Sequence, residues 1–186
     1  MKKTSWLPRL PETLAHGLHS VLRWPASFMQ QLQKYGLHQP VVQIMTQQWR
    51  LATHEDCEVL ALQGRSQVLV RDVLIGTDKA KKAEWMLARS VFPHSLLRGP
   101  ERQLGQLKTR PLGRVLFRHP HMVREAFEFA ELSPSRLEED FHWASQKALW
   151  ARRSIFRLRG KPLLLTEIFL PDLVDWLDRN PHILFG

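Results

Sequence analysis

Cysteine is almost absent from the sequence: Cys57 is the only one among 186 residues. An internal disulfide framework is therefore excluded, and a cysteine-rich zinc site is not predicted. The sequence also lacks runs of about 18 apolar residues, which a membrane-spanning helix needs. The first residues hold two lysines but no apolar segment of the signal-peptide kind, because Pro8 and Pro11 interrupt them. We therefore expect a cytoplasmic protein with no membrane span.

The short motifs of common catalytic sites are missing as well. There is no Walker loop, no G-x-G-x-x-G, no G-x-S-x-G and no H-E-x-x-H. Nine histidines are present, but none has an acidic or cysteine partner at the spacing of metal ligands, so no metal site is predicted. Positive charge is in excess, with a net charge of +9 that attracts anions. The cations are scattered rather than interleaved with aromatic residues, so nucleic-acid binding is not expected.

The residues that are present predict a folded domain of the α+β class. Apolar residues make up 44% of the chain, and the length suits one domain over residues 1–186. Helical spacing or capping residues predict helices in five segments: 11–35 with a break at Trp24-Pro25 and Ser27 as a cap, 108–120 with Thr109 as a cap, 121–132, 135–153, and a short one in the tail. β-branched or alternating apolar residues predict strands over 39–52, 58–64, 66–76, 84–93, and on both sides of a turn at Gly160. We expect a single antiparallel sheet with helices packed on it.

Three of the apolar strands each contain an ionisable residue. Because side chains two apart share one face of a strand, Glu167 lies in an apolar row, and so do Arg71 and Arg89. Burying an unpaired charge costs several kcal/mol, so each of these groups needs a partner. Two interpretations stay open at this point. The charges form a structural Arg–Glu pair inside the core, or they line a closed pocket whose surplus positive charge holds a small organic anion.

These segments resemble the chorismate lyase (chorismate pyruvate-lyase) family. The resemblance lies in "LVRDVLI", "WMLARSVFP", "KTRPLGRVLF" and "LWARRSIFRLRGKPLLLTEIFLP", in that order. It covers residues 27–171, and residues 172–186 form a C-terminal extension. The resemblance implies a chorismate-lyase-like fold, in which the sheet and its helices enclose an internal ligand cavity. Residues 25–36 and 93–107 are the expected covers of that cavity.

The resemblance also implies which residues form the site. The arginine that binds the substrate carboxylate falls on Arg71, the backbone amide that assists it on Leu112, and the pocket glutamate on Glu167. Arg89 matches a further arginine near the ligand, implied to meet the enolpyruvyl carboxylate or to hold an anion on its way in or out. A pocket-lining position near the start of the matched region falls on Phe28 or Met29.

The implied reaction converts chorismate to 4-hydroxybenzoate and pyruvate, the first step of ubiquinone biosynthesis, in a monomer that needs no cofactor. Glu167 would lie at the end of the substrate opposite Arg71, near the ether oxygen. It could donate to the leaving oxygen if protonated, or accept from the product phenol if ionised, and the sequence leaves both roles open. An alternative function is a non-catalytic sensor of small anions, because the same fold resembles effector-binding domains of bacterial regulators.

Overall fold

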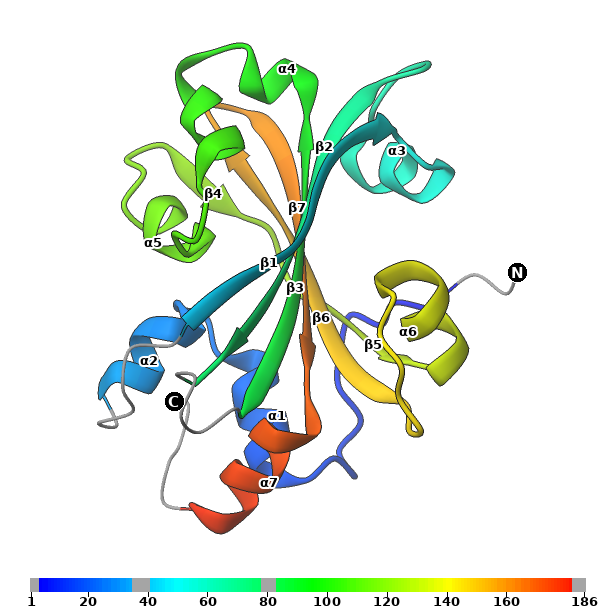
Figure 1. Ribbon diagram of the computed structural model, residues 1–186, viewed down its shortest axis with the longest axis vertical. Helices are drawn as coiled ribbons and strands as arrows, with labels where there is room; N and C mark the ends of the chain where they lie inside the picture. Colours follow the sequence, from blue (N-terminus) through cyan, green and yellow to red (C-terminus); the bar gives the residue numbers. More distant parts are fainter. Residues whose placement is uncertain (1–3, 35–40, 78–82, 182–186) are drawn as a thin grey trace.

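One antiparallel sheet of seven strands dominates the computed structural model, which describes residues 4–34, 41–77 and 83–181. The strands follow the order β1-β2-β3-β7-β6-β4, and β5 pairs with the same edge of β6 as β4 does (Figure 1). Their bounds are β1 (Val41–Leu51), β2 (Gln67–Gly76), β3 (Glu84–Pro93), β4 (Met122–Arg124), β5 (Glu128–Leu132), β6 (Leu149–Leu158) and β7 (Lys161–Phe169). The α+β class and the single antiparallel sheet that the sequence predicted are confirmed.

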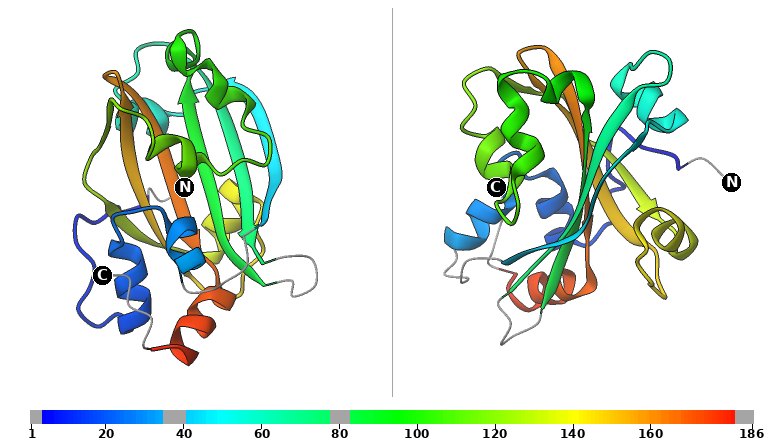
Figure 2. Two further views of the ribbon diagram at one scale, coloured as in Figure 1. Left: turned by 90° about the vertical axis from the view of Figure 1, so that its left-hand side faces the viewer. Right: turned by 45° about the horizontal axis from the view of Figure 1, so that its top comes forward.

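Helices cover both faces of this sheet (Figures 1 and 2). One face carries α1 (His16–Arg23), α2 (Phe28–Lys34) and α5 (Leu112–Leu116), and the other carries α3 (His54–Leu60) and α6 (Pro134–Phe141). At the ends of the sheet lie α4 (His94–Leu97), the 3₁₀ helix η1 (Pro100–Gln106) and α7 (Pro171–Arg179). No helix in the described ranges has the length and apolar character needed to cross a membrane.

The sheet has an apolar layer on each face because its side chains alternate. Ile75, Met86 and Phe169 are neighbours across three strands and pack under α1, α2 and α7. One residue along the strands, Leu74 and Leu87 are neighbours on the opposite face and belong to the core under α6. The first of these layers, together with its extension under α5, encloses the cavity described below.

Two segments form different elements from those predicted. Residues 58–64 were expected to be a strand, but residues 54–60 form α3. A capping box at Thr53 and Asp56 starts this helix, and Ala61 ends it in the left-handed conformation with φ of 51°. Residues 121–132 were expected to be helical, but they form β4 and β5. The long strand β6 presents an edge whose backbone groups need partners, and pairing with them overrides the helical spacing.

The remaining predictions have mixed outcomes. The predicted helix over 135–153 is limited to α6, because His142 adopts a left-handed conformation and Leu149 already starts β6. The predicted cap at Thr109 is wrong, since Pro111 directly precedes α5. The hairpin around Gly160 and the short helix in the tail are both confirmed.

Candidate ligand-binding cavity

A cavity lies between the sheet and the helices on the α1–α2–α5 side. The strands contribute its floor, which is apolar except for Ser90 and charged side chains from β2, β4, β6 and β7. Residues 26–29, at the start of α2, and residues 111–113, at the start of α5, lie over this floor. Residues 93–107 were also expected to cover the cavity, but none of them lines it. Residues 35 and 36 of the other expected cover lie outside the described residues.

Arg71 is one of the most buried side chains of the protein, with 1% of its surface exposed. Its Nη2 donates to the backbone carbonyls of Lys108 at 2.7 Å and Arg110 at 3.3 Å, so a loop rather than a carboxylate holds it. The side chain lines the cavity, and its Nε has no acceptor among the residues that the structure describes. Burial lowers the pKa of this guanidinium. Arg71 is therefore a buried cation that still needs an anion.

Glu167 lines the same cavity and forms an ion pair with Arg152. The Nε of Arg152 donates to Oε2 of Glu167 at 2.6 Å, and both residues are buried. Oε1 of Glu167 has no partner among the described residues. Nη1 of Arg152 also donates to carbonyls at the end of α1 and just after it, the shortest bond being 2.8 Å to Trp24. The structural ion pair and the pocket, which the sequence offered as alternatives, thus coexist at Glu167.

Arg152 was missed by the sequence reasoning, although a signal for it exists. The turn at Arg159-Gly160 pairs Leu158 with Lys161, and counting along both strands from there places Arg152 opposite Glu167. The hairpin had been predicted, but its register had not been followed to this pair. Register fixes which side chains share a face, so a predicted tight turn also predicts cross-strand partners.

Leu112 and both candidate residues of the first cover lie at the cavity as well. Leu112 is the first residue of α5, and Phe28 and Met29 begin α2. The structure therefore brings Arg71, Leu112 and Glu167 to one enclosed space, together with Phe28 and Met29.

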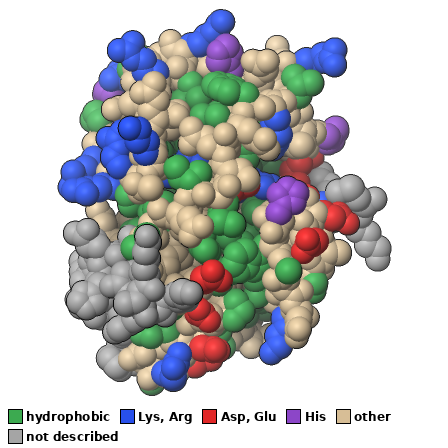
Figure 3. Space-filling model, in the orientation of Figure 1, with side chains coloured by type: hydrophobic (Ala, Val, Ile, Leu, Met, Phe, Trp, Pro, Cys, Tyr) green, Lys and Arg blue, Asp and Glu red, His purple; other side chains and the backbone are tan. Residues whose placement is uncertain are grey.

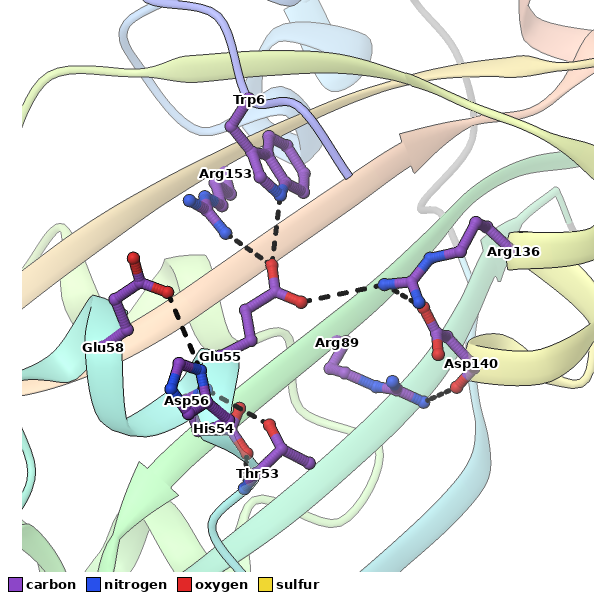
Figure 4. A network of polar contacts seen from close by, with 10 residues as sticks. All are labelled: Trp6, Thr53, His54, Glu55, Asp56, Glu58, Arg89, Arg136, Asp140 and Arg153. Carbon is purple, nitrogen blue, oxygen red and sulfur yellow. Dashed lines mark hydrogen bonds and ion pairs between the residues drawn. The ribbon is translucent and has the colours of Figure 1, made fainter. Parts of the chain in front are cut away.

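Arg89 is not at this cavity, which corrects its predicted position near the ligand. It lies on the opposite face of the sheet, where its Nε donates to Oδ1 of Asp72 at 2.8 Å. Its guanidinium also lies 4.2 Å from the centre of the Phe141 ring. It donates to the backbone carbonyl of Asp140 as well (Figure 4). The sequence shows which side chains of β3 share a face with Arg89. It does not show that this row and the row of Arg71 in β2 lie on opposite faces of the sheet. In the register of the sheet, Arg71 pairs with Ser90 and not with Arg89.

Arg124, the last residue of β4, also lines the cavity and was not predicted to do so. It is opposite Phe156 of β6, which shares its face, and its guanidinium lies over aromatic rings. Its segment is predicted to be helical, so nothing in the sequence places Arg124 near the other charged residues. Elsewhere in the described ranges, His, Cys, Asp and Glu do not gather in groups of three or more that could hold a metal.

Exposed cations gather on the outer surface beside the cavity. Figure 3 shows Lys and Arg side chains on the upper left, where Figure 1 places α5 and the segment before it. The exposed cations of this part of the chain are Arg98, Arg102, Lys108, Arg110, Arg114 and Arg118. The helical side that covers the cavity is thus positively charged.

The cavity beside this antiparallel sheet is thus lined by three arginines and one carboxylate, which gives it a surplus of positive charge. The sequence model of the family described as chorismate lyase matches residues 2–177, so the chain belongs to that family. The matched range is wider than residues 27–171, over which the motifs carried the resemblance.

The curated relatives agree with this assignment. A chorismate pyruvate-lyase of Erwinia tasmaniensis is 35% identical over 169 residues, which cover 89% of this chain and 85% of that relative. A chorismate pyruvate-lyase of Yersinia enterocolitica is 45% identical over 87 residues, or 47% of this chain and 44% of that relative. A probable chorismate pyruvate-lyase of Methylococcus capsulatus is 35% identical over 129 residues, or 65% and 74% of the two chains.

Among solved structures, the effector domain of PhnF from Mycobacterium smegmatis has a similar fold. Its TM-score is 0.55 at 12% sequence identity, with 79% of this chain and 90% of that chain covered. At this identity the likeness concerns the fold alone.

Proposed function

We propose that this protein is a chorismate pyruvate-lyase, which converts chorismate to 4-hydroxybenzoate and pyruvate. The observation that carries the proposal is the joint placement of Arg71, Leu112 and Glu167 around one buried cavity. The three positions came from family motifs in separate parts of the sequence, so their meeting in space is an independent support. The names of the curated relatives point to the same reaction.

Arg71 binds the ring carboxylate of the substrate in this proposal. Its unpartnered Nε and its Nη atoms can make a two-point contact with a carboxylate, the geometry for which arginine is suited. Leu112 adds its backbone N–H, which belongs to the first turn of α5 and so has no acceptor inside the helix. The Lys108 and Arg110 carbonyls fix the guanidinium, so little motion is lost on binding.

Glu167 acts at the other end of the ring. Strand β3 lies between Arg71 and Glu167, and the register offsets them by two residues. Strand spacing and rise then put their Cα atoms roughly 12 Å apart, which leaves room for one ring between the side chains. Because Arg152 occupies Oε2, the substrate meets Oε1 of Glu167.

In the reaction, the bond between the ring and the enolpyruvyl oxygen breaks. The proton on the neighbouring, hydroxyl-bearing ring carbon is lost, and the ring becomes aromatic. Enolpyruvate leaves with its oxygen and takes up a proton to become pyruvate. Aromatisation drives the reaction, so the chain has to orient the substrate and stabilise charge in a site that excludes water. Glu167 interacts with the ring hydroxyl or with the leaving oxygen, depending on its protonation.

The proposal includes four further properties of the enzyme. The reaction proceeds without a metal or an organic cofactor, it supplies 4-hydroxybenzoate for ubiquinone biosynthesis, it takes place in the cytoplasm, and the enzyme is a monomer. The single cysteine and the absence of metal-ligand spacing in the sequence support the first and third of these points.

Purified protein incubated with chorismate tests the function. We expect pyruvate and 4-hydroxybenzoate to form in equal amounts, measured with lactate dehydrogenase and by chromatography. The competing function is a sensor without catalysis, for which the fold of the PhnF effector domain is the supporting observation. A protein that binds 4-hydroxybenzoate in calorimetry but releases no pyruvate from chorismate would be a sensor, and the enzyme proposal would be wrong.

A further inference from the structure

Arg124 is the cavity-lining cation to which the proposed reaction has so far given no role. Aromatic rings surround its guanidinium, with Cζ 4.2 Å from the centre of Phe127 and about 6 Å from the centres of Phe117 and Phe156. Contacts of this kind stabilise a cation partly, but they leave all its N–H donors available. The rings also shield the group from water, so it is half-buried.

The guanidinium of Arg124 has no hydrogen-bond acceptor and forms no direct ion pair among the described residues. The other arginines on the strands all have one. Their acceptors are Asp56 for Arg50, two carbonyls for Arg71, Asp72 for Arg89, Glu167 for Arg152, Glu128 for Arg153 and Glu125 for Arg157. A guanidinium that is partly desolvated and lacks an acceptor is costly unless something else supplies the anion.

The net charge of the cavity also favours an anionic ligand at Arg124. Arg71, Arg124 and Arg152 line it as cations, and Glu167 is the one carboxylate among its lining residues in the described ranges. The pKa of Arg124 is lowered by burial and by nearby Arg152, while Glu167 opposes that shift. Arg124 and Arg152 also contact the same ring, with Cζ 4.2 Å and 4.7 Å from the centre of Phe127, so Arg124 lies beside the Arg152–Glu167 pair, whereas Arg71 is on β2. An empty cavity carries a surplus of two positive charges, which a dianion would neutralise.

We infer that Arg124 binds the second carboxylate of a dicarboxylate substrate, which under the proposed function is the enolpyruvyl carboxylate of chorismate. Arg71 then holds the ring carboxylate, Glu167 faces the ring oxygens, and Arg124 takes the group that hangs from one of those oxygens. This is the role that the sequence had assigned to Arg89, which lies on the other face of the sheet.

Substrate and product differ in the number of carboxylates that they offer to the two arginines. 4-Hydroxybenzoate has only the ring carboxylate, so it contacts Arg71 but leaves Arg124 without an anion. Chorismate satisfies both arginines. Arg124 thus favours binding of the substrate over binding of the aromatic product. The carboxylate that Arg124 binds leaves the site as part of pyruvate.

The test compares Arg124→Met, Arg124→Lys and Arg65→Gln with the wild type. Methionine keeps the long apolar contact with Phe127 and removes the charge, lysine keeps the charge, and Arg65 is an exposed arginine outside the cavity. For Arg124→Met we expect kcat/KM for chorismate to fall about 10- to 100-fold, the range for losing a hydrogen bond to a charged group. The dissociation constant of 4-hydroxybenzoate should change less than about threefold on the same scale. Arg124→Lys should recover part of the loss, and Arg65→Gln should match the wild type.

The product affinity also reports whether the variant is folded, because it needs an intact cavity. Equal losses for chorismate and 4-hydroxybenzoate would give Arg124 a structural role and overturn the inference, as would an unchanged kcat/KM. If wild-type protein binds chorismate without converting it, the proposed function fails. Calorimetry with chorismate then tests Arg124 directly through the same pair of variants. No binding of chorismate at all would overturn both proposals.

Discussion

At the scale of single residues, Arg71 and Arg152 show how the same side chain can serve different ends. Arg152 is satisfied by a carboxylate and by carbonyls at the end of α1, so it joins a helix to the sheet. Arg71 is satisfied only in part, by two loop carbonyls, and its Nε remains without an acceptor among the described residues. Burial is similar for the two, and the difference in partners separates the structural arginine from the proposed binding arginine.

Replacement of Arg71 by alanine tests that distinction. We expect the binding free energy of 4-hydroxybenzoate to weaken by about 2–5 kcal/mol, the usual loss when one partner of a buried charged contact is truncated. Catalytic activity should fall with it, because the ring carboxylate is no longer held. Calorimetry measures the first effect and pyruvate release the second, with Arg65→Ala as the control. Wild-type affinity for the product in Arg71→Ala would contradict the role.

Glu167 has two roles, and a pair of variants separates them. Glu167→Gln removes the negative charge beside Arg152, so we expect lower stability toward urea, by at most about 3–5 kcal/mol. Turnover should fall about 10²- to 10⁴-fold if Glu167 transfers a proton.

The double variant Glu167→Gln, Arg152→Met removes the unpaired cation as well. We expect it to regain stability relative to Glu167→Gln without regaining activity, as measured by urea unfolding and pyruvate release. Recovery of turnover in the double variant would mean that Glu167 serves only to balance Arg152.

At the scale of elements, the β2–β3 and β6–β7 hairpins could be predicted from the sequence, and the edge segments could not. Strands β2, β3, β6 and β7 are rich in β-branched and apolar residues, and the tight turn at Gly160 marks the second hairpin. The apolar residues of 121–132 are spaced as in a helix, and the strand conformation of this segment depends on the neighbouring edge of β6. Because of that dependence on a partner distant in sequence, the position of Arg124 at the cavity could not be predicted either.

The turn of the β6–β7 hairpin offers a test at this scale. Arg159 and Gly160 both have positive φ, 50° and 79°, as a two-residue hairpin turn requires. Gly160→Val introduces a β-branched side chain in the left-handed region, so we expect a loss of about 1–2 kcal/mol in the free energy of unfolding. Gly105→Ala is the matched control, because its new Cβ would meet only ordinary contacts from 3.5 Å outward. Urea unfolding of both variants gives the comparison, and equal stability would show that the turn is not strained by the substitution.

At the scale of the whole molecule, charge and burial act together. The protein has a net charge of +9, and some of its exposed Lys and Arg side chains lie on the α5 side. This side covers the cavity that contains the excess of arginines. An anion attracted to this surface arrives at the segments that cover the cavity, residues 26–29 and 111–113. Since these segments cover the cavity, the proposed function requires them to separate for substrate to enter and for product to leave.

A disulfide between the two covers tests that opening. A Cβ added at Gly113 would lie 3.3 Å from Oγ of Ser27, which suits a disulfide between cysteines at the two positions. In a Cys57→Ser background, the oxidised Ser27→Cys, Gly113→Cys protein should release pyruvate from chorismate at least about 10-fold more slowly than its reduced form, because release of product through a moving cover often sets kcat.

Each single cysteine variant serves as a control and should show no dependence on reductant. Addition of dithiothreitol should restore the rate of the double variant, which would exclude damage to the fold. Because the disulfide holds the start of α2 against the start of α5 without touching Arg71 or Glu167, the loss would report motion of the covers rather than of the binding residues. Full activity of the oxidised protein would mean that ligands pass by another route and that these two segments can stay together throughout turnover.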